Sequence, residues 1–99
     1  MSATWGRRLE AYTLACPQEV LLVTATIEGD RDEIAVFKGF SSSLVRSTAF
    51  DPDVPVLPES AEILSIDRVA SPYVPANPHY IERGLSLSQM EARLQAVGV

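Results

Sequence analysis

Residues 19–40, EVLLVTATIEGDRDEIAVFKGF, contain two β-strand patterns separated by turn residues. The first run, 19–28, is apolar at its start and alternating towards its end. Its alternation places on one face the side chains of Leu21, Val23, Ala25 and Ile27. After the polar turn 29–32, the second run, 33–40, resumes the apolar pattern. Because a short polar turn between two such runs is typical of a hairpin, the sequence predicts an antiparallel pair here.

Helices are expected at both ends of the chain. Trp5, Leu9 and Tyr12 recur at i, i+4 and i+7, which predicts a helix over about residues 4–15, ended by Pro17. Near the C-terminus, Ser86 followed by Gln89 forms a capping-box pattern. Leu85 and Met90 are spaced as a hydrophobic staple across this cap. The buried stripe of the C-terminal helix, which runs up to Gly98, is expected to contain Leu87, Met90, Leu94 and Val97.

The middle of the chain adds at least one more strand. Residues 61–70 are strand-like, with Ile63, Leu64, Ile66 and Val69, and are expected beside the hairpin. Ser41–Ser43 is interpreted as a polar loop, and 44–50 as either a short strand or a covering loop. Asn77, Pro78 and Gly84 predict a short helix over 79–83.

The expected fold is therefore one α+β domain, residues 1–99. It has N-terminal and C-terminal helices and a small antiparallel sheet of three to five strands, either open or rolled towards a barrel.

Prolines form two evenly spaced triplets on either side of the 61–70 run. They are Pro52, Pro55 and Pro58, and Pro72, Pro75 and Pro78. Proline fixes φ and has no amide donor, so 51–58 can be neither a helix nor a central strand. Period three is the period of polyproline II, which serves as a rigid buttress or as a recognition surface. The sequence leaves both roles open.

Composition narrows the class of protein. The 99 residues are 46% apolar and 21% charged, as in an ordinary globular domain. The net charge of −5 is concentrated between Glu28 and Asp67, where nine acids face three bases, which argues against nucleic acid as a partner. Cys16 is the only cysteine, and no apolar run reaches membrane-spanning length. We therefore expect a cytoplasmic protein without membrane insertion, either monomeric or homodimeric.

No constellation of side chains predicts catalysis. The sole histidine, His79, has no evident link to the Ser41–Ser43 hydroxyls, as a serine nucleophile would require. The pairs Asp30/Asp32 and Asp51/Asp53 lack the further ligands of a calcium loop. We therefore assign no catalytic, cofactor-binding or metal-binding residue and expect a protein that is not an enzyme.

Three stretches carry a resemblance: VFKGFSSSL at 36–44, TAFDPDVPVLP at 48–58 and IERGLS at 81–86. Together they resemble a family of small uncharacterised proteins of cyanobacteria and plant plastids. The resemblance implies a setting, the cytoplasm or the plastid stroma of an oxygenic phototroph. It implies no activity.

The leading hypothesis is a non-enzymatic domain that contacts a protein partner through segment 40–58. The expected contact residues are Phe40, Phe50, Val54, Val56 and Leu57. A first alternative is an RNA-binding small barrel, with cations and stacking aromatics drawn from Arg7, Arg8, Arg46, Arg68, Phe37, Phe40 and Tyr73. A second alternative is a small-ligand domain that uses the Ser41–Ser43 hydroxyls.

Overall fold

The computed structural model describes residues 5–27, 29–43, 61–74 and 76–99. Along the sequence, one helix precedes the strands and one follows them, as predicted. The elements are α1 (Trp5–Ala15), β1 (Glu19–Ile27), β2 (Asp30–Phe37), β3 (Phe40–Ser43), β4 (Glu62–Ala70), β5 (Tyr80–Leu85) and α2 (Leu87–Ala96). The fold is α+β, which confirms the predicted class.

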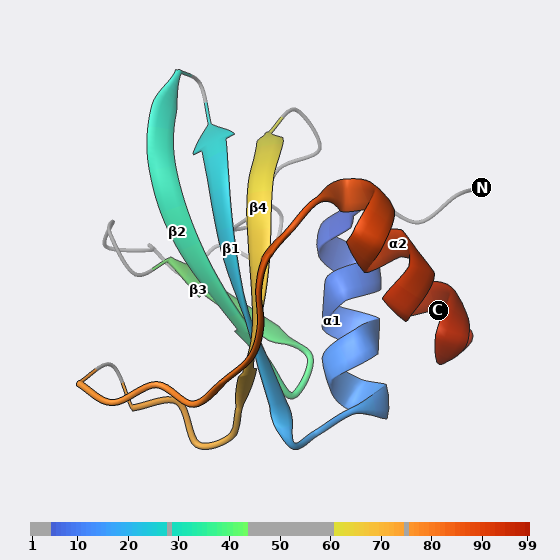
Figure 1. The fold of residues 1–99 in the computed structure, drawn as a ribbon. Coiled ribbons are helices and arrows are strands. Elements are labelled where there is room, and N and C mark those ends of the chain that lie inside the picture. The colour runs from blue at the N-terminus through green and yellow to red at the C-terminus, as the bar shows by residue number, and fades with distance from the viewer. Residues whose placement is uncertain (1–4, 28, 44–60, 75) are drawn as a thin grey trace.

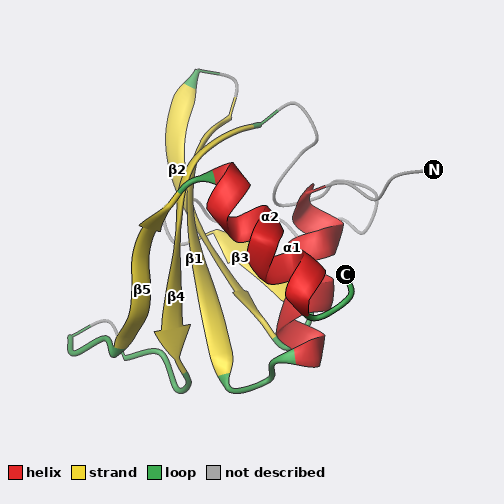
Figure 2. Cartoon of the chain, turned by 45° about the vertical axis from the view of Figure 1, so that its right-hand side comes forward, coloured by secondary structure: helices red, strands yellow, loops and turns green. Residues whose placement is uncertain are grey.

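The five strands form one sheet in the order β3-β2-β1-β4-β5, with every neighbouring pair antiparallel. The predicted hairpin lies at its centre, because β1 pairs with both β2 and β4. The sheet is open, which is one of the two expected forms, and β3 and β5 are its edge strands within the described residues. Both helices lie on the same side of the sheet, and the opposite side carries no helix among the described residues (Figures 1 and 2).

The hydrophobic core lies between the sheet and the two helices. It draws on β1 through the face predicted from alternation, and on α1 through Leu9 and Tyr12, which are buried. The remaining buried members of the core cluster are Ile34, Val36, Ile66, Leu85, Met90 and Leu94. Trp5 packs against this cluster. The burial of one face towards this core explains why sequence periodicity located α1, β1 and α2 correctly.

The second hairpin corrects the sequence interpretation of residues 33–43. Lys38 and Gly39 both have positive φ, 48° and 82°, which is the backbone of a two-residue type I′ turn. The run 33–40 is therefore interrupted after Phe37, and Phe37 pairs with Phe40 across the turn. Ser41–Ser43, interpreted as a polar loop, belongs to strand β3. Lysine is an uncommon residue at the first position of such a turn, so the sequence signal was weak.

Strand β5 replaces the helix predicted over 79–83. Glu82 pairs with Arg68 and Leu85 with Ile66, which leaves two residues of β5, Arg83 and Gly84, opposite Asp67 alone. This is a β-bulge, and Gly84 takes the positive φ of 65° that the bulge requires. The Gly84 amide donates to Asp67 Oδ1 over 2.7 Å. Gly84 is interpreted from the sequence as the end of a helix, but its positive φ belongs to this β-bulge.

Helix α2 begins with the predicted capping box. Ser86 Oγ accepts a hydrogen bond from the Gln89 amide at 3.2 Å, and Gln89 Oε1 accepts one from the Ser86 amide at 2.9 Å. The predicted stripe is only half correct, because Met90 and Leu94 are buried whereas Leu87 and Val97 are 36% and 39% exposed. Leu87 is the first helical residue and Val97 is the C-cap, so only the middle turns of α2 face the core.

Candidate interaction surface

The two faces of the sheet are chemically different. Leu21 and Val23 belong to the core cluster, so their side chains point towards the helices. Val20 alternates with them and therefore points to the other side, which we call the outer face. Val20 pairs with Val69, and neither residue belongs to the core cluster although both are buried, at 3% and 0% exposure. The outer face thus has apolar content of its own.

One apolar row crosses the outer face from edge to edge. Phe40 pairs with Phe37, and continuation of the β1–β2 register places Phe37 level with Val20. Val20 pairs with Val69, and Val69 pairs with Tyr80. The centre of this row is buried, whereas its ends are open, with Phe40 79% and Tyr80 38% exposed. The next row along the strands is more polar: Ser42, Ala35, Leu22 and Asp67.

At the β3 end, four residues form what we call the hairpin patch: Leu14, Phe37, Lys38 and Phe40. The patch is fixed to α1, because the Gly39 amide donates to Thr13 Oγ1 at 2.9 Å and Ser41 Oγ donates to Glu10 Oε2 at 2.8 Å. A Cβ at Gly39 would lie 3.0 Å from the Leu14 side chain, so glycine permits this close packing. These contacts hold the turn against α1, and the side chain of Phe40 beside the turn is exposed to solvent.

Cations sit over the aromatic rings at both ends of the row. Lys38 Nζ lies 5.2 Å from the centroid of Phe37, and Arg83 Cζ lies 4.2 Å from that of Tyr80. We call Tyr80 and Arg83 the β5 patch. Within the described part of the chain, neither Lys38 nor Arg83 has an ion pair. Their charges are thus held in place by aromatic rings and remain available to a partner.

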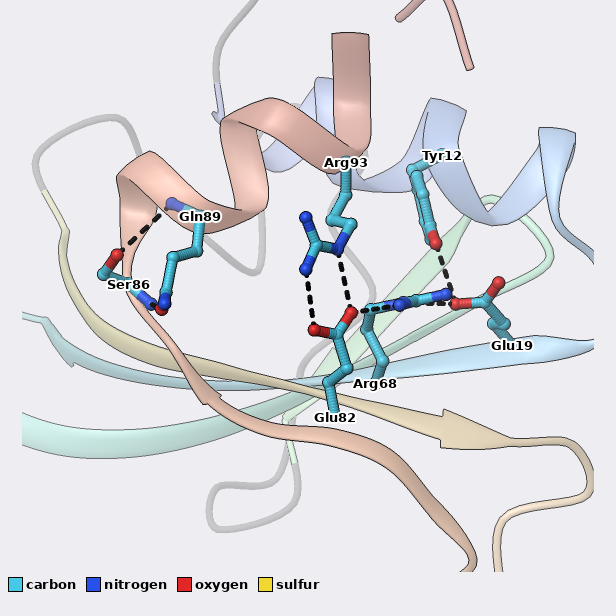
Figure 3. Close-up of polar contacts among 7 residues, drawn as sticks. All are labelled: Tyr12, Glu19, Arg68, Glu82, Ser86, Gln89 and Arg93. Carbon is cyan, nitrogen blue, oxygen red and sulfur yellow. Dashed lines mark hydrogen bonds and ion pairs between the residues drawn. The ribbon is translucent and has the colours of Figure 1, made fainter. Parts of the chain in front are cut away.

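On the helix side, the charges pair with one another (Figure 3). Glu19 Oε1 accepts hydrogen bonds from Tyr12 Oη at 2.8 Å and from Arg68 Nε at 2.7 Å. Arg68 also pairs with Glu82 through Nη1, and Arg93 binds both Glu82 oxygens at 2.9 and 2.8 Å. These five residues come from five elements, α1, β1, β4, β5 and α2. We call them the clasp, because they join both helices to the sheet.

The clasp is unsuited to acid–base chemistry. Burial, followed by the hydrogen bond to Glu19, raises the pKa of Tyr12. Burial alone would raise the pKa of Glu19, but hydrogen bonds from Arg68 and Tyr12 outweigh it and lower that pKa. Hydrogen bonds from Arg93 and Arg68 lower the pKa of Glu82 to about 2. A general acid or base needs a pKa near the working pH, and each of these shifts leads away from neutrality. The clasp is therefore structural.

Several residues considered for catalysis or for ligand binding form hydrogen bonds within the chain, and Asp51 and Asp53 lie outside the described residues. Ser41 is bonded to Glu10, and Ser43 Oγ donates to Asp32 Oδ1 at 2.8 Å. His79 is exposed, and its carbonyl accepts from the Ala70 amide. Among residues 5–27, 29–43, 61–74 and 76–99, no group of three or more His, Cys, Asp or Glu side chains is placed to hold a metal ion. No helix in these same ranges is long and apolar enough to span a membrane.

Of the predicted contact residues, Phe40 lies on the surface, on the edge strand β3 of the described sheet. Phe50, Val54, Val56 and Leu57 lie outside the described residues, as does the first proline triplet. Members of the RNA-binding set within the described residues lie on different faces of the sheet. Arg8 pairs with Glu91 and Arg68 belongs to the clasp, both on the helix side, whereas Phe37 and Phe40 lie on the outer face.

Sequence reasoning missed both the clasp and the β5 patch. No spacing relates the clasp residues, since each comes from a different element. The β5 patch was hidden because 79–83 was interpreted as a helix, which does not place Tyr80 beside Val69 at the edge of the sheet. The signal for the hairpin patch was the Lys38-Gly39 pair between two phenylalanines.

Comparison with known proteins adds the family but no activity. Residues 6–94 match the model of a family described as a domain of unknown function, DUF7734. No curated protein and no solved structure matches the chain. Because the match covers nearly all of the sequence, from α1 into α2, the chain belongs to the DUF7734 family.

Proposed function

We propose that this domain is a non-enzymatic protein-interaction module, and that the hairpin patch is its contact surface. The observation that carries the proposal is the exposure of Phe40. It is a large aromatic side chain, 79% exposed at a sheet edge, and is held there by a turn that is fastened to α1. Aromatic anchors presented on rigid elements dominate many protein interfaces, because little conformational entropy is lost on binding.

The neighbours of Phe40 support the same conclusion. Leu14, 65% exposed, lies against Gly39 and extends the apolar surface around the tip of the hairpin. Phe37 and Lys38 add an aromatic ring and a charge beside it. Single exposed apolar residues are ordinary on protein surfaces. A group of neighbouring apolar residues on a turn that hydrogen bonds hold in place is more typical of a binding site.

The biological setting is also a proposal. The resemblance of residues 36–44, 48–58 and 81–86 to proteins of cyanobacteria and plant plastids supports an accessory, assembly or regulatory role in a photosynthetic organism. The corresponding location is the cytoplasm or, for plant relatives, the plastid stroma. Monomer and homodimer are both compatible with this role.

Partner capture tests the proposal. Three tagged proteins, the wild type, Phe40→Ala and the control Leu87→Ala, are incubated with a soluble extract of a cyanobacterium. Leu87 is a partly exposed apolar residue on α2, away from the hairpin. We expect the wild type and Leu87→Ala to retain the same protein in stoichiometric amount, and Phe40→Ala to lose it. Retention by all three proteins, or by none, would contradict the proposal.

A further inference from the structure

The charges near the apolar row suggest the chemistry of the partner. Both ends of the row carry a cation above an aromatic ring, Lys38 over Phe37 and Arg83 over Tyr80. On the helix side, by contrast, Arg8, Arg68 and Arg93 are paired with carboxylates of this same chain. A partner that approaches the outer face therefore meets cations whose attraction is not already satisfied by an ion pair within the described residues.

The geometry of the sheet sets the distance between these two positive ends. Phe40 lies on β3 and Tyr80 on β5, at opposite edges of the five-stranded sheet. Four strand spacings of about 4.8 Å separate them, roughly 19 Å in all. An extended chain rises about 3.3 Å per residue, so a segment of about six residues spans the row.

We infer that the two open ends of the row, the hairpin patch and the β5 patch, bind an extended acidic peptide segment of a partner protein, which passes over the buried centre between them. Its apolar side chains would be about six residues apart, one beside Phe40 and one beside Tyr80, with carboxylates facing Lys38 and Arg83. The inference rests on the proposed function and adds the class of partner.

Charge complementarity favours this occupant over RNA. The row offers two cations, whereas binding to a phosphate backbone rests on several clustered ones. Acids also share the outer face: Asp67 pairs with Leu22, and Glu33 and Glu62 lie on the rows beyond it. A peptide can direct its carboxylates to the two cations and place uncharged residues beside Glu33 and Glu62, whereas a polyanion with evenly spaced charges cannot.

Selection from a random library of twelve-residue peptides on the immobilised full chain tests the inference even though the partner is unidentified. A parallel selection uses Phe40→Ala as the bait. We expect the wild type to enrich acidic peptides with two apolar residues about six positions apart, and the Phe40→Ala bait not to enrich them. Enrichment of basic or neutral peptides, or equal enrichment on both baits, would overturn it.

Charge-reversal variants of the protein, measured with the best peptide from the selection, locate the binding site of that peptide. In Lys38→Glu and in Arg83→Glu we expect the Kd to rise about tenfold, while the control Arg31→Glu, exposed on β2 far from the row, leaves it unchanged. Amide NMR shifts should map to both ends of the row. If Phe40→Ala abolishes binding but neither reversal weakens it, the acidic-peptide inference fails while the interaction surface stands. A twelve-nucleotide oligouridylate that binds more tightly than the peptide would also overturn it.

Discussion

The helix side and the outer face of this sheet are made from the same strands but differ in how their side chains are satisfied. On the helix side, apolar groups are buried in one cluster and the charges of the clasp bind one another. On the outer face, only the centre of the apolar row is buried, and Lys38 and Arg83 lie over aromatic rings. This difference is the basis of the proposed division of labour, in which one face serves folding and the other serves binding.

The largest difference in stability is expected between two leucines of α1. Leu9 is fully buried in the core cluster, whereas Leu14 is 65% exposed. Leu9→Ala should lower the free energy of unfolding by about 3 kcal/mol, because it leaves a cavity, and Leu14→Ala by less than about 0.5 kcal/mol. Urea denaturation of both variants measures this. Similar losses for the two would mean that Leu14 contributes to the core.

A smaller difference is expected between two arginines. Arg68 is held by Glu19 and Glu82 in the clasp, with 16% of its side chain exposed, whereas Arg83 lies over the ring of Tyr80 and has no ion pair within the described residues. Arg68→Ala leaves two carboxylates without this cation and should destabilise the fold by about 2 kcal/mol. Arg83→Ala should cost less than about 0.5 kcal/mol. Equal losses in thermal denaturation would contradict the separation of the faces.

The smallest effect concerns pH. The pKa of Glu82 is lowered from 4.5 to about 2, so its stabilising contribution is complete above pH 4.5 and is lost as the pH falls towards 2. In Glu82→Gln this titration is absent, so its melting temperature should fall less steeply over that range than that of the wild type. Glu62→Gln, an exposed acid of β4, serves as the control. A wild-type slope in Glu82→Gln would contradict this role of the clasp.

Much of this fold could be predicted from local patterns, because helix and strand periodicities reflect one-sided burial. The faces of α1 and β1 and the capping box of α2 are such cases. The β2–β3 turn was missed because lysine at its first position gives a weak turn signal, and β5 was missed because its pairing with β4 decides it. Glu82 and Arg68, for example, are 14 residues apart. For the candidate surface, the sequence analysis named Phe40 as a contact residue, which stays a prediction, but could not place Arg83 and Tyr80 at the opposite end of the same row.

The most direct test of this division of labour measures two quantities in the same two variants. The free energy of unfolding and the affinity for the captured partner are determined for Phe40→Ala and Met90→Ala, at a temperature where both are folded. We predict that Phe40→Ala keeps its stability and loses affinity, whereas Met90→Ala, altered in the core beneath the opposite face, loses stability and keeps its affinity. If Phe40→Ala loses stability as Met90→Ala does, or if both bind as the wild type does, the outer face is not a binding surface built around Phe40.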